Sequence, residues 1–78
     1  MNEPIVSTFK HGQRVAVINS TLSGRFFVES LNAVVLRRTY GDQYRVRIGN
    51  DTVDRFLDQA AQHDPAAYVA KLNAQVQA

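Results

Sequence analysis

Residues 43–48 alternate strictly between apolar and polar side chains, and this pattern constrains the fold of the 78-residue chain more than any other feature. In an extended strand the three apolar side chains would point to one side, and Arg45 and Arg47 would point to the other. Turn-forming glycine, aspartate and asparagine residues flank the segment, at 40–43 and 49–51. The pattern therefore predicts consecutive antiparallel hairpins with one buried and one cationic surface.

Four more segments have the length and the composition of strands. The expected strands are residues 14–18, 25–29, 33–39, 43–48 and 52–57. The third is apolar on both faces and is expected at the centre of the sheet, whereas the polar fifth is expected at an edge. Because an isolated three-stranded sheet would leave the third strand uncovered, the sequence predicts an all-β fold with a C-terminal helix, a five-stranded SH3-like barrel.

Residues 65–76 change to a helical period. We expect Asp64 to cap this helix and Pro65 to occupy its first position, with a helical turn at residues 58–63 leading in. The helix would either cover the open end of the barrel or form a subunit contact, because a domain of this size is near the lower limit of independent stability and a homo-oligomer is plausible. The residues that would make this core or subunit contact are Tyr68, Leu72 and Val76.

The composition excludes several classes of protein. The absence of cysteine excludes thiolate catalysis, zinc fingers and disulfide bonds. With 45% hydrophobic and 21% charged residues, the chain has the composition of a folded domain. No apolar run approaches the roughly 20 residues that a membrane span requires, and the first four residues lack the cationic start of a secretory signal. We therefore expect a cytoplasmic protein without membrane contact. The expected divisions are a flexible arm (1–8), the barrel (9–57) and a helical segment (58–78).

No group of residues has the spacing of a catalytic or metal site. Asp51, Asp54 and Asp58 resemble part of a calcium-binding loop. However, an aromatic residue stands where that loop requires glycine, and a glutamine stands where it requires glutamate. His11 and His63 have no evident acid–base partner. We therefore expect a protein that is not an enzyme and holds no metal or cofactor.

The charge is distributed unevenly along the chain. The formal net charge is only +2, but residues 10–50 contain seven basic and two acidic residues, and the segment after them carries an excess of acid. If a tight turn joins the third and fourth strands, Arg37 lies nearly opposite Arg45, and the two repel each other unless an anion or a carboxylate lies between them. The alternative is neutralisation within the chain by Glu29, Asp54 or the acidic C-terminal part. The residues expected to bind nucleic acid or another anionic partner are Arg25, Arg37, Arg38, Tyr40, Arg45 and Arg47.

The start of the expected barrel, residues 12–17 followed by 24–28, resembles small barrels of the KOW and Tudor kind. In those domains a glycine opens the first strand, valines alternate along it, and a second glycine precedes the second strand. KOW domains usually carry a further glycine where this chain has residues 19–21. The resemblance covers a short part of the chain and implies an SH3-like module that binds nucleic acid or protein.

The same segments are similar to the first two strands of the plasmid-borne type B dihydrofolate reductases. Those enzymes are SH3-like chains of nearly this length that form tetramers around a central pore, with a Val-Gln-Ile-Tyr motif at the pore floor. At the corresponding strand this chain has Thr52, Val53, Asp54 and Arg55, so the glutamine and tyrosine are absent and an aspartate would face a polyanionic cofactor. The alternative function implied by this resemblance is an oligomeric oxidoreductase.

The function that these observations favour is a small non-catalytic interaction module. It would bind a protein partner or, non-specifically, nucleic acid through the arginine-rich face of its sheet. The expected helix carries a single cation, Lys71, and would read a major groove poorly, so single-stranded nucleic acid or RNA suits the chain better than duplex DNA. Such a domain fits accessory proteins such as those of bacterial plasmids or phages.

Overall fold

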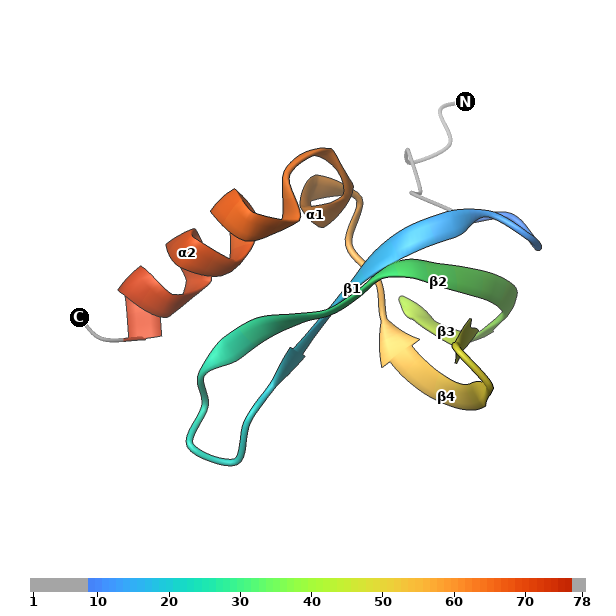
Figure 1. Cartoon of the computed structure of the whole chain (residues 1–78), viewed down its shortest axis with the longest axis horizontal. Coiled ribbons are helices and arrows are strands. Elements are labelled where there is room, and N and C mark those ends of the chain that lie inside the picture. The colour runs from blue at the N-terminus through green and yellow to red at the C-terminus, as the bar shows by residue number, and fades with distance from the viewer. Residues whose placement is uncertain (1–8, 77–78) are drawn as a thin grey trace, which may run out of the picture.

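Four antiparallel strands, hydrogen-bonded in the order of the chain, are followed by two helices (Figure 1). The computed structural model describes residues 9–76. The elements are β1 (Arg14–Ser20), β2 (Phe26–Tyr40), β3 (Gln43–Ile48), β4 (Asp51–Phe56), α1 (Gln59–His63) and α2 (Pro65–Val76). The predicted alternating strand is confirmed as β3, and β4 lies at an edge of the sheet as expected. Gly41 and Gly49 adopt positive φ angles of 53° and 62°, which the tight turns before and after β3 require.

β2 replaces the two separate strands expected at 25–29 and 33–39. It runs for 15 residues through the polar segment 30–32, and it pairs with β1 over its first part and with β3 over its last part. The ladder with β1 shifts register on both sides of Val17, which lies opposite Ser30. Such irregularities bend a strand without ending it. The expected break was therefore wrong, because pairing with β1 resumes at Ala33 directly after the irregularity and β2 stays one strand.

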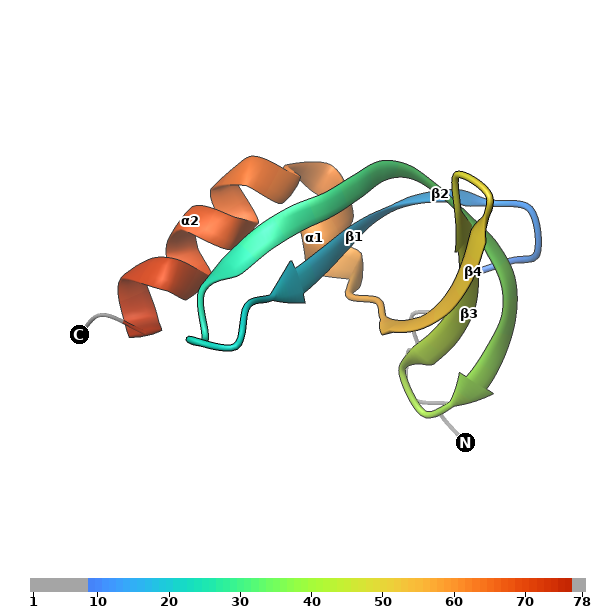
Figure 2. The ribbon, with the colours of Figure 1, turned by 60° about the horizontal axis from the view of Figure 1, so that its bottom comes forward.

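The sheet is open, so the expectation of a closed five-stranded SH3-like barrel was wrong. The second and third expected strands form the single strand β2, so the sheet has four strands. Within residues 9–76 no ladder joins the edge strands β1 and β4. Figure 2 shows β2 curving along its length, so that β3 and β4 lie at one end of the molecule and the helices at the other. The chain after β4 forms helices, which add no strand to the sheet.

The core lies on one side of the sheet, which we call the inner face. Val17, Val35 and Val46 are fully buried there, and Tyr44 is 1% exposed. The ring of Phe9 packs edge-on against Tyr44 with centroids 5.3 Å apart, and the Phe9 backbone N–H donates to the Tyr44 hydroxyl at 3.2 Å. The segment before β1 is thereby held on the inner face, and the opposite, outer face of β3 and β4 stays free of it.

Both helices begin at a capping aspartate, of which Asp64 was predicted. The Asp58 carboxylate accepts from the Ala60 backbone N–H at 2.9 Å at the start of α1, and Asp64 accepts from Ala67 at 3.2 Å at the start of α2. The expected bounds of the C-terminal helix, 65–76, are confirmed. α2 lies beside the hairpin of β1 and β2 and contains no fully buried residue (Figure 1).

Two side-chain amides attach the helices to the edges of the hairpin. Gln62 accepts from the backbone N–H of Ala16 at 2.7 Å and donates to its carbonyl at 3.0 Å. Asn73 makes the same pair of bonds with Phe26, at 2.8 and 3.0 Å. Each amide satisfies the N–H and the C=O of a residue on a strand edge that has no neighbouring strand there, as another strand would do.

The expected flexible arm at residues 1–8 lies outside the described residues, as do residues 77–78 of the expected helical segment. None of the helices within residues 9–76 is long and apolar enough to cross a membrane.

Candidate functional site

The outer face of the sheet gathers four arginines from three strands. Strand pairing places its side chains in three adjacent rows, because residues directly opposite each other on paired strands point to the same side. The rows are Arg14–Val34–Arg47–Thr52, Arg37–Arg45–Asp54 and Tyr40–Gln43–Phe56. We call the first two rows the arginine face and the third row the aromatic row.

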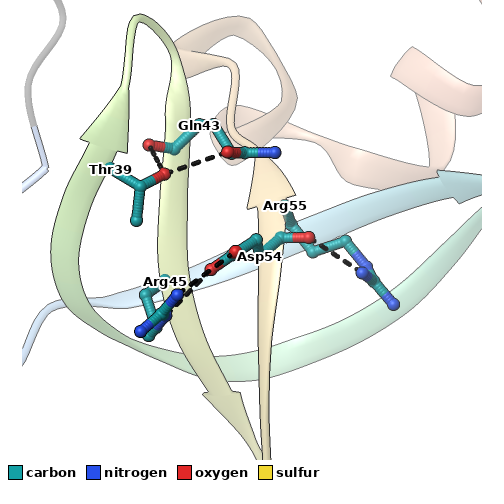
Figure 3. A network of polar contacts seen from close by, with 5 residues as sticks. All are labelled: Thr39, Gln43, Arg45, Asp54 and Arg55. Atoms are coloured by element: carbon teal, nitrogen blue, oxygen red, sulfur yellow. Dashed lines mark hydrogen bonds and ion pairs between the residues drawn. The ribbon is translucent and has the colours of Figure 1, made fainter.

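The middle row confirms that Arg37 lies opposite Arg45, and it contains the carboxylate that the repulsion argument required. Arg45 Nε donates to Asp54 Oδ1 at 3.0 Å, and Arg45 Nη2 donates to Oδ2 at 3.4 Å (Figure 3). These hydrogen bonds from Arg45 hold the pKa of the Asp54 carboxyl below its usual value, and the nearby charge of Arg37 acts in the same direction. Asp54 thus neutralises one of the two facing arginines.

Three arginines of this face keep their charge uncompensated within residues 9–76. The guanidinium groups of Arg14, Arg37 and Arg47 form no ion pair or hydrogen bond there, and all three residues are exposed. The face therefore carries four cations and one anion. Internal neutralisation, the alternative left open by the sequence, is partial.

Two other expected site residues lie away from this face. Arg38 is paired with the inward-facing Tyr44, and its Nε donates to the carbonyl of Gly41 at 2.6 Å within the turn. Arg25 is exposed at the turn between β1 and β2, at the far end of that hairpin (Figure 1). The structure therefore brings together Arg37, Arg45, Arg47 and Tyr40, and it adds Arg14.

The aromatic row contains a residue that the sequence analysis missed. Tyr40 is 78% exposed and Phe56 is 66% exposed, at opposite ends of the row. Phe56 was taken only as part of the fifth strand, but the alternation in that strand places it on the same side as Asp54. The alternation of this strand therefore indicated the face on which Phe56 lies. Burial statistics, however, do not predict an exposed phenylalanine on a polar face.

The neighbouring ion pair lies outside the arginine face. Arg55 points to the inner side of β4 and donates from Nε and Nη2 to the two oxygens of Glu29, at 2.7 and 3.0 Å. Its Nη1 also donates to the carbonyl of Asp54 at 2.8 Å. Hydrogen bonds from Arg55 lower the pKa of Glu29, and burial opposes this only in part. Glu29 is therefore used within the fold and does not compensate the outer arginines.

A groove of about 610 Å³ separates the helices from the sheet. Tyr68 and Leu72 line it together with Ile18, Phe26 and Phe56, and the Tyr68 hydroxyl donates to the Asp58 carboxylate at 2.7 Å. This hydrogen bond is the main cause of a raised Tyr68 pKa. Of the three helix residues expected to make a core or subunit contact, these two face the chain's own sheet across the groove, and Val76 is exposed.

No cluster of three or more potential metal ligands occurs in the part of the chain that the structure describes. Comparisons with protein-family models, with curated proteins and with solved structures found no match to this chain.

Proposed function

We propose that this protein is a non-catalytic binding module in the cytoplasm that holds single-stranded nucleic acid on its arginine face through phosphate contacts, which carry no sequence information. The observation that carries the proposal is the shared orientation of Arg14, Arg37, Arg45 and Arg47 on one exposed sheet surface with a single compensating carboxylate, Asp54. Like charges held together on a folded surface cost free energy, and an anionic ligand relieves that cost.

The layout of the charges favours a chain of phosphates over a single small anion. Arg45 and Arg47 are two residues apart on β3, so their Cα atoms are separated by about 7 Å, and Arg37 and Arg14 extend the face across two neighbouring strands. The cations are spread over a surface and do not converge on one point. Guanidinium groups also match phosphate geometry.

The exposed aromatic row favours a single strand over a duplex. Unpaired bases expose their ring faces and stack on aromatic side chains, whereas bases in a duplex do not. Tyr40 and Phe56 lie in the row next to Arg37 and Arg45, within reach of a strand whose phosphates contact those arginines. The helix α2 packs beside the hairpin and carries one cation, Lys71, which gives little support for reading a major groove.

The test is a fluorescence-anisotropy titration of labelled single-stranded and duplex oligonucleotides over a series of salt concentrations. We expect the logarithm of the single-strand binding constant to fall linearly with the logarithm of salt concentration. Arg37→Gln and Arg47→Gln should each reduce that slope by about 0.7, the value for one lost phosphate contact on a single strand. Arg45 is left intact because its removal would also strip Asp54 of its partner.

Arg25→Gln is the matched control, because it removes the same charge from an exposed site at the other end of the β1–β2 hairpin. Equal losses in Arg25→Gln and Arg47→Gln would show attraction by net charge alone and would refute a defined face. No binding of any oligonucleotide at low salt would refute the nucleic-acid proposal, and binding of an acidic protein partner would then be the next hypothesis to test.

A further inference from the structure

We propose that Tyr40, Gln43 and Phe56 form a base-binding subsite that takes an unpaired base bearing a carbonyl group, uracil or thymine in preference to adenine. This inference rests on the proposed binding of single-stranded nucleic acid and names the part of the ligand that the aromatic row receives.

The position of the three side chains follows from strand pairing. Gln43 lies directly opposite Tyr40 on one side and Phe56 on the other, so all three point from the outer face. Since neighbouring strands are about 4.8 Å apart, the two aromatic residues are separated by about 10 Å with the Gln43 amide between them. Two exposed rings on either side of a polar group form an open platform on which bases can stack.

The Gln43 amide is oriented by its neighbour Thr39. The Thr39 hydroxyl lies 3.0 Å from the Gln43 carbonyl oxygen and 3.1 Å from the side-chain Oε1 (Figure 3). The contact engages Oε1 as an acceptor, and Figure 3 shows Nε2 directed away from Thr39. Nε2 has no hydrogen-bond acceptor among residues 9–76, so its two N–H donors are free for a ligand on a residue that strand pairing places between Tyr40 and Phe56.

Those donors determine which bases fit. Uracil and thymine carry two carbonyl oxygens on the ring edge, and either one accepts an amide N–H by itself. Adenine has no carbonyl group, and its N7 acceptor lies beside an amino donor, so the usual glutamine–adenine pair also needs the amide oxygen, which Thr39 already engages here. Stacking alone would not favour the smaller pyrimidine ring over a purine. A preference for thymine or uracil over adenine would therefore come from the hydrogen bond to Gln43 and not from the aromatic side chains.

The subsite is continuous with the arginine face. Gln43 and Arg45 are separated by one residue on β3, and Phe56 and Asp54 by one residue on β4, so the two rows are about 7 Å apart. A nucleic-acid strand whose phosphates lie over Arg37 and Arg45 would direct its bases toward the aromatic row. The phosphate and the base of one nucleotide would thus contact two neighbouring rows of the sheet.

The experiment compares labelled oligothymidylate, oligoadenylate and an abasic oligonucleotide of equal length, and therefore equal charge, by fluorescence anisotropy. For the wild-type protein we expect the order thymidylate, adenylate, abasic. Tyr40→Leu and Phe56→Leu should weaken binding of thymidylate by about 5- to 150-fold, the range for loss of one stacked base, with an unchanged salt slope. Phe27→Leu, on the β1–β2 hairpin, is the matched control for an exposed aromatic residue.

Gln43→Met tests the carbonyl preference, because it keeps the length of the side chain and removes the donors. The ratio of thymidylate to adenylate affinity should fall to one or below. Tyr40, Gln43 and Phe56 lie outside the core, so we expect each variant to fold. Circular dichroism of each variant checks this. An unchanged ratio in Gln43→Met would overturn the carbonyl preference.

The two proposals fail in distinguishable ways. If the abasic oligonucleotide binds as tightly as thymidylate, while Arg37→Gln and Arg47→Gln still weaken binding, the arginine face stands and the base-binding subsite is refuted. If neither arginine variant changes binding, the proposed function itself is refuted.

Discussion

At the scale of single residues, Tyr44 combines packing and hydrogen bonding in the core. Its ring contacts Phe9, and its hydroxyl accepts the Phe9 backbone N–H although the residue is buried. Tyr44→Phe keeps the ring and leaves that N–H without its acceptor. We expect the free energy of unfolding to fall by about 1–3 kcal/mol, the cost of one unsatisfied buried polar group. Urea denaturation measures the difference.

Tyr40→Phe is the control for this prediction, since Tyr40 is exposed and its hydroxyl has no hydrogen-bond partner within residues 9–76. It removes the same atom and should leave the unfolding free energy unchanged within error. Equal stability of Tyr44→Phe and the wild type would show that water replaces the hydroxyl at Phe9, and that the segment before β1 is held by ring packing alone.

The residues of the arginine face could be predicted from the sequence only in part. Alternation placed Arg45 and Arg47 on one side of a strand, and the tight turn placed Arg37 opposite Arg45. The pairing of Arg45 with Asp54 was one of several alternatives, because register between strands depends on turn length and cannot be read from one strand. Arg38 directly follows Arg37, so alternation predicts that it lies on the other face, and its pairing with Tyr44 places it there.

At the scale of secondary-structure elements, the ion pair between Glu29 and Arg55 connects the first part of β2 to the edge strand β4. Arg55 holds the pKa of the Glu29 carboxyl below its ordinary value of 4.5. Because the folded-state pKa is the lower one, the stabilisation is fully present above about pH 4.5 and is lost as the pH falls through the folded-state pKa. The bridge therefore links two distant strands only while Glu29 is ionised.

Glu29→Gln should lower the free energy of unfolding by about 1 kcal/mol at pH 7, as expected for a half-buried charged hydrogen bond. The difference from the wild type should shrink as the pH is lowered from 5 to 3. Urea denaturation at several pH values measures this. Asp51→Asn, which alters an exposed carboxylate of β4 outside both ion pairs, should leave the unfolding free energy unchanged. A constant difference at all pH values would exclude an electrostatic origin.

The contact between α2 and β2 depends on the side-chain amide of Asn73, which bonds both backbone groups of Phe26. In Asn73→Ala both bonds are lost, and the edge of β2 opens more often. We expect amide hydrogen exchange at Phe26 to accelerate by about 5- to 30-fold, which corresponds to 1–2 kcal/mol of local stability. Gln75→Ala, at an exposed position of the same helix, is the control.

Exchange at Val46 in the centre of β3 reports on the rest of the sheet and should not change in Asn73→Ala. If it accelerates as much as exchange at Phe26, α2 is required for global stability and the amide does not act locally. Unchanged exchange at Phe26 would show that the Asn73 amide does not hold the edge of β2 closed.

The elements with strong local signals were predictable, and those that depend on distant contacts were not. Asp64 and Pro65 mark the start of α2 by capping chemistry, and alternation marks β3. Ser30 and Asn32 also gave a local signal, a break between two strands, but Ser30 and Ala33 both pair with β1 and the strand continues. Tertiary pairing overrode composition there, and the number of strands changed with it.

At the scale of the whole molecule, the missing closure of the barrel follows from that one merged strand. Four strands form an open sheet, the helices lie beside the β1–β2 hairpin, and β3 and β4 lie at the other end (Figure 2). The groove beside the helices reaches Phe56 at the end of the aromatic row, whereas no arginine of the arginine face lines it. The arginine face therefore stays open, and Tyr40 and Phe56 remain largely exposed. The open architecture thus leaves a cationic sheet surface available to a ligand.

Because its arginines are held together by the fold, the whole protein should become more stable when an anionic strand binds. A ligand present at a hundred times its dissociation constant adds about 2.7 kcal/mol to the free energy of unfolding, which for a domain of this size raises the melting temperature by roughly 10 °C or more. Circular dichroism melting with and without oligothymidylate measures the shift.

At the same oligonucleotide concentration the shift should be smaller for the Arg37→Gln, Arg47→Gln double variant, and it should disappear for the wild type at high salt, because screening removes the attraction. A shift that persists at high salt would mean that apolar contacts dominate binding. No shift in the wild type under conditions where anisotropy shows saturation would mean that the ligand binds the unfolded chain equally well, which contradicts a site assembled by the pairing of β1, β2, β3 and β4.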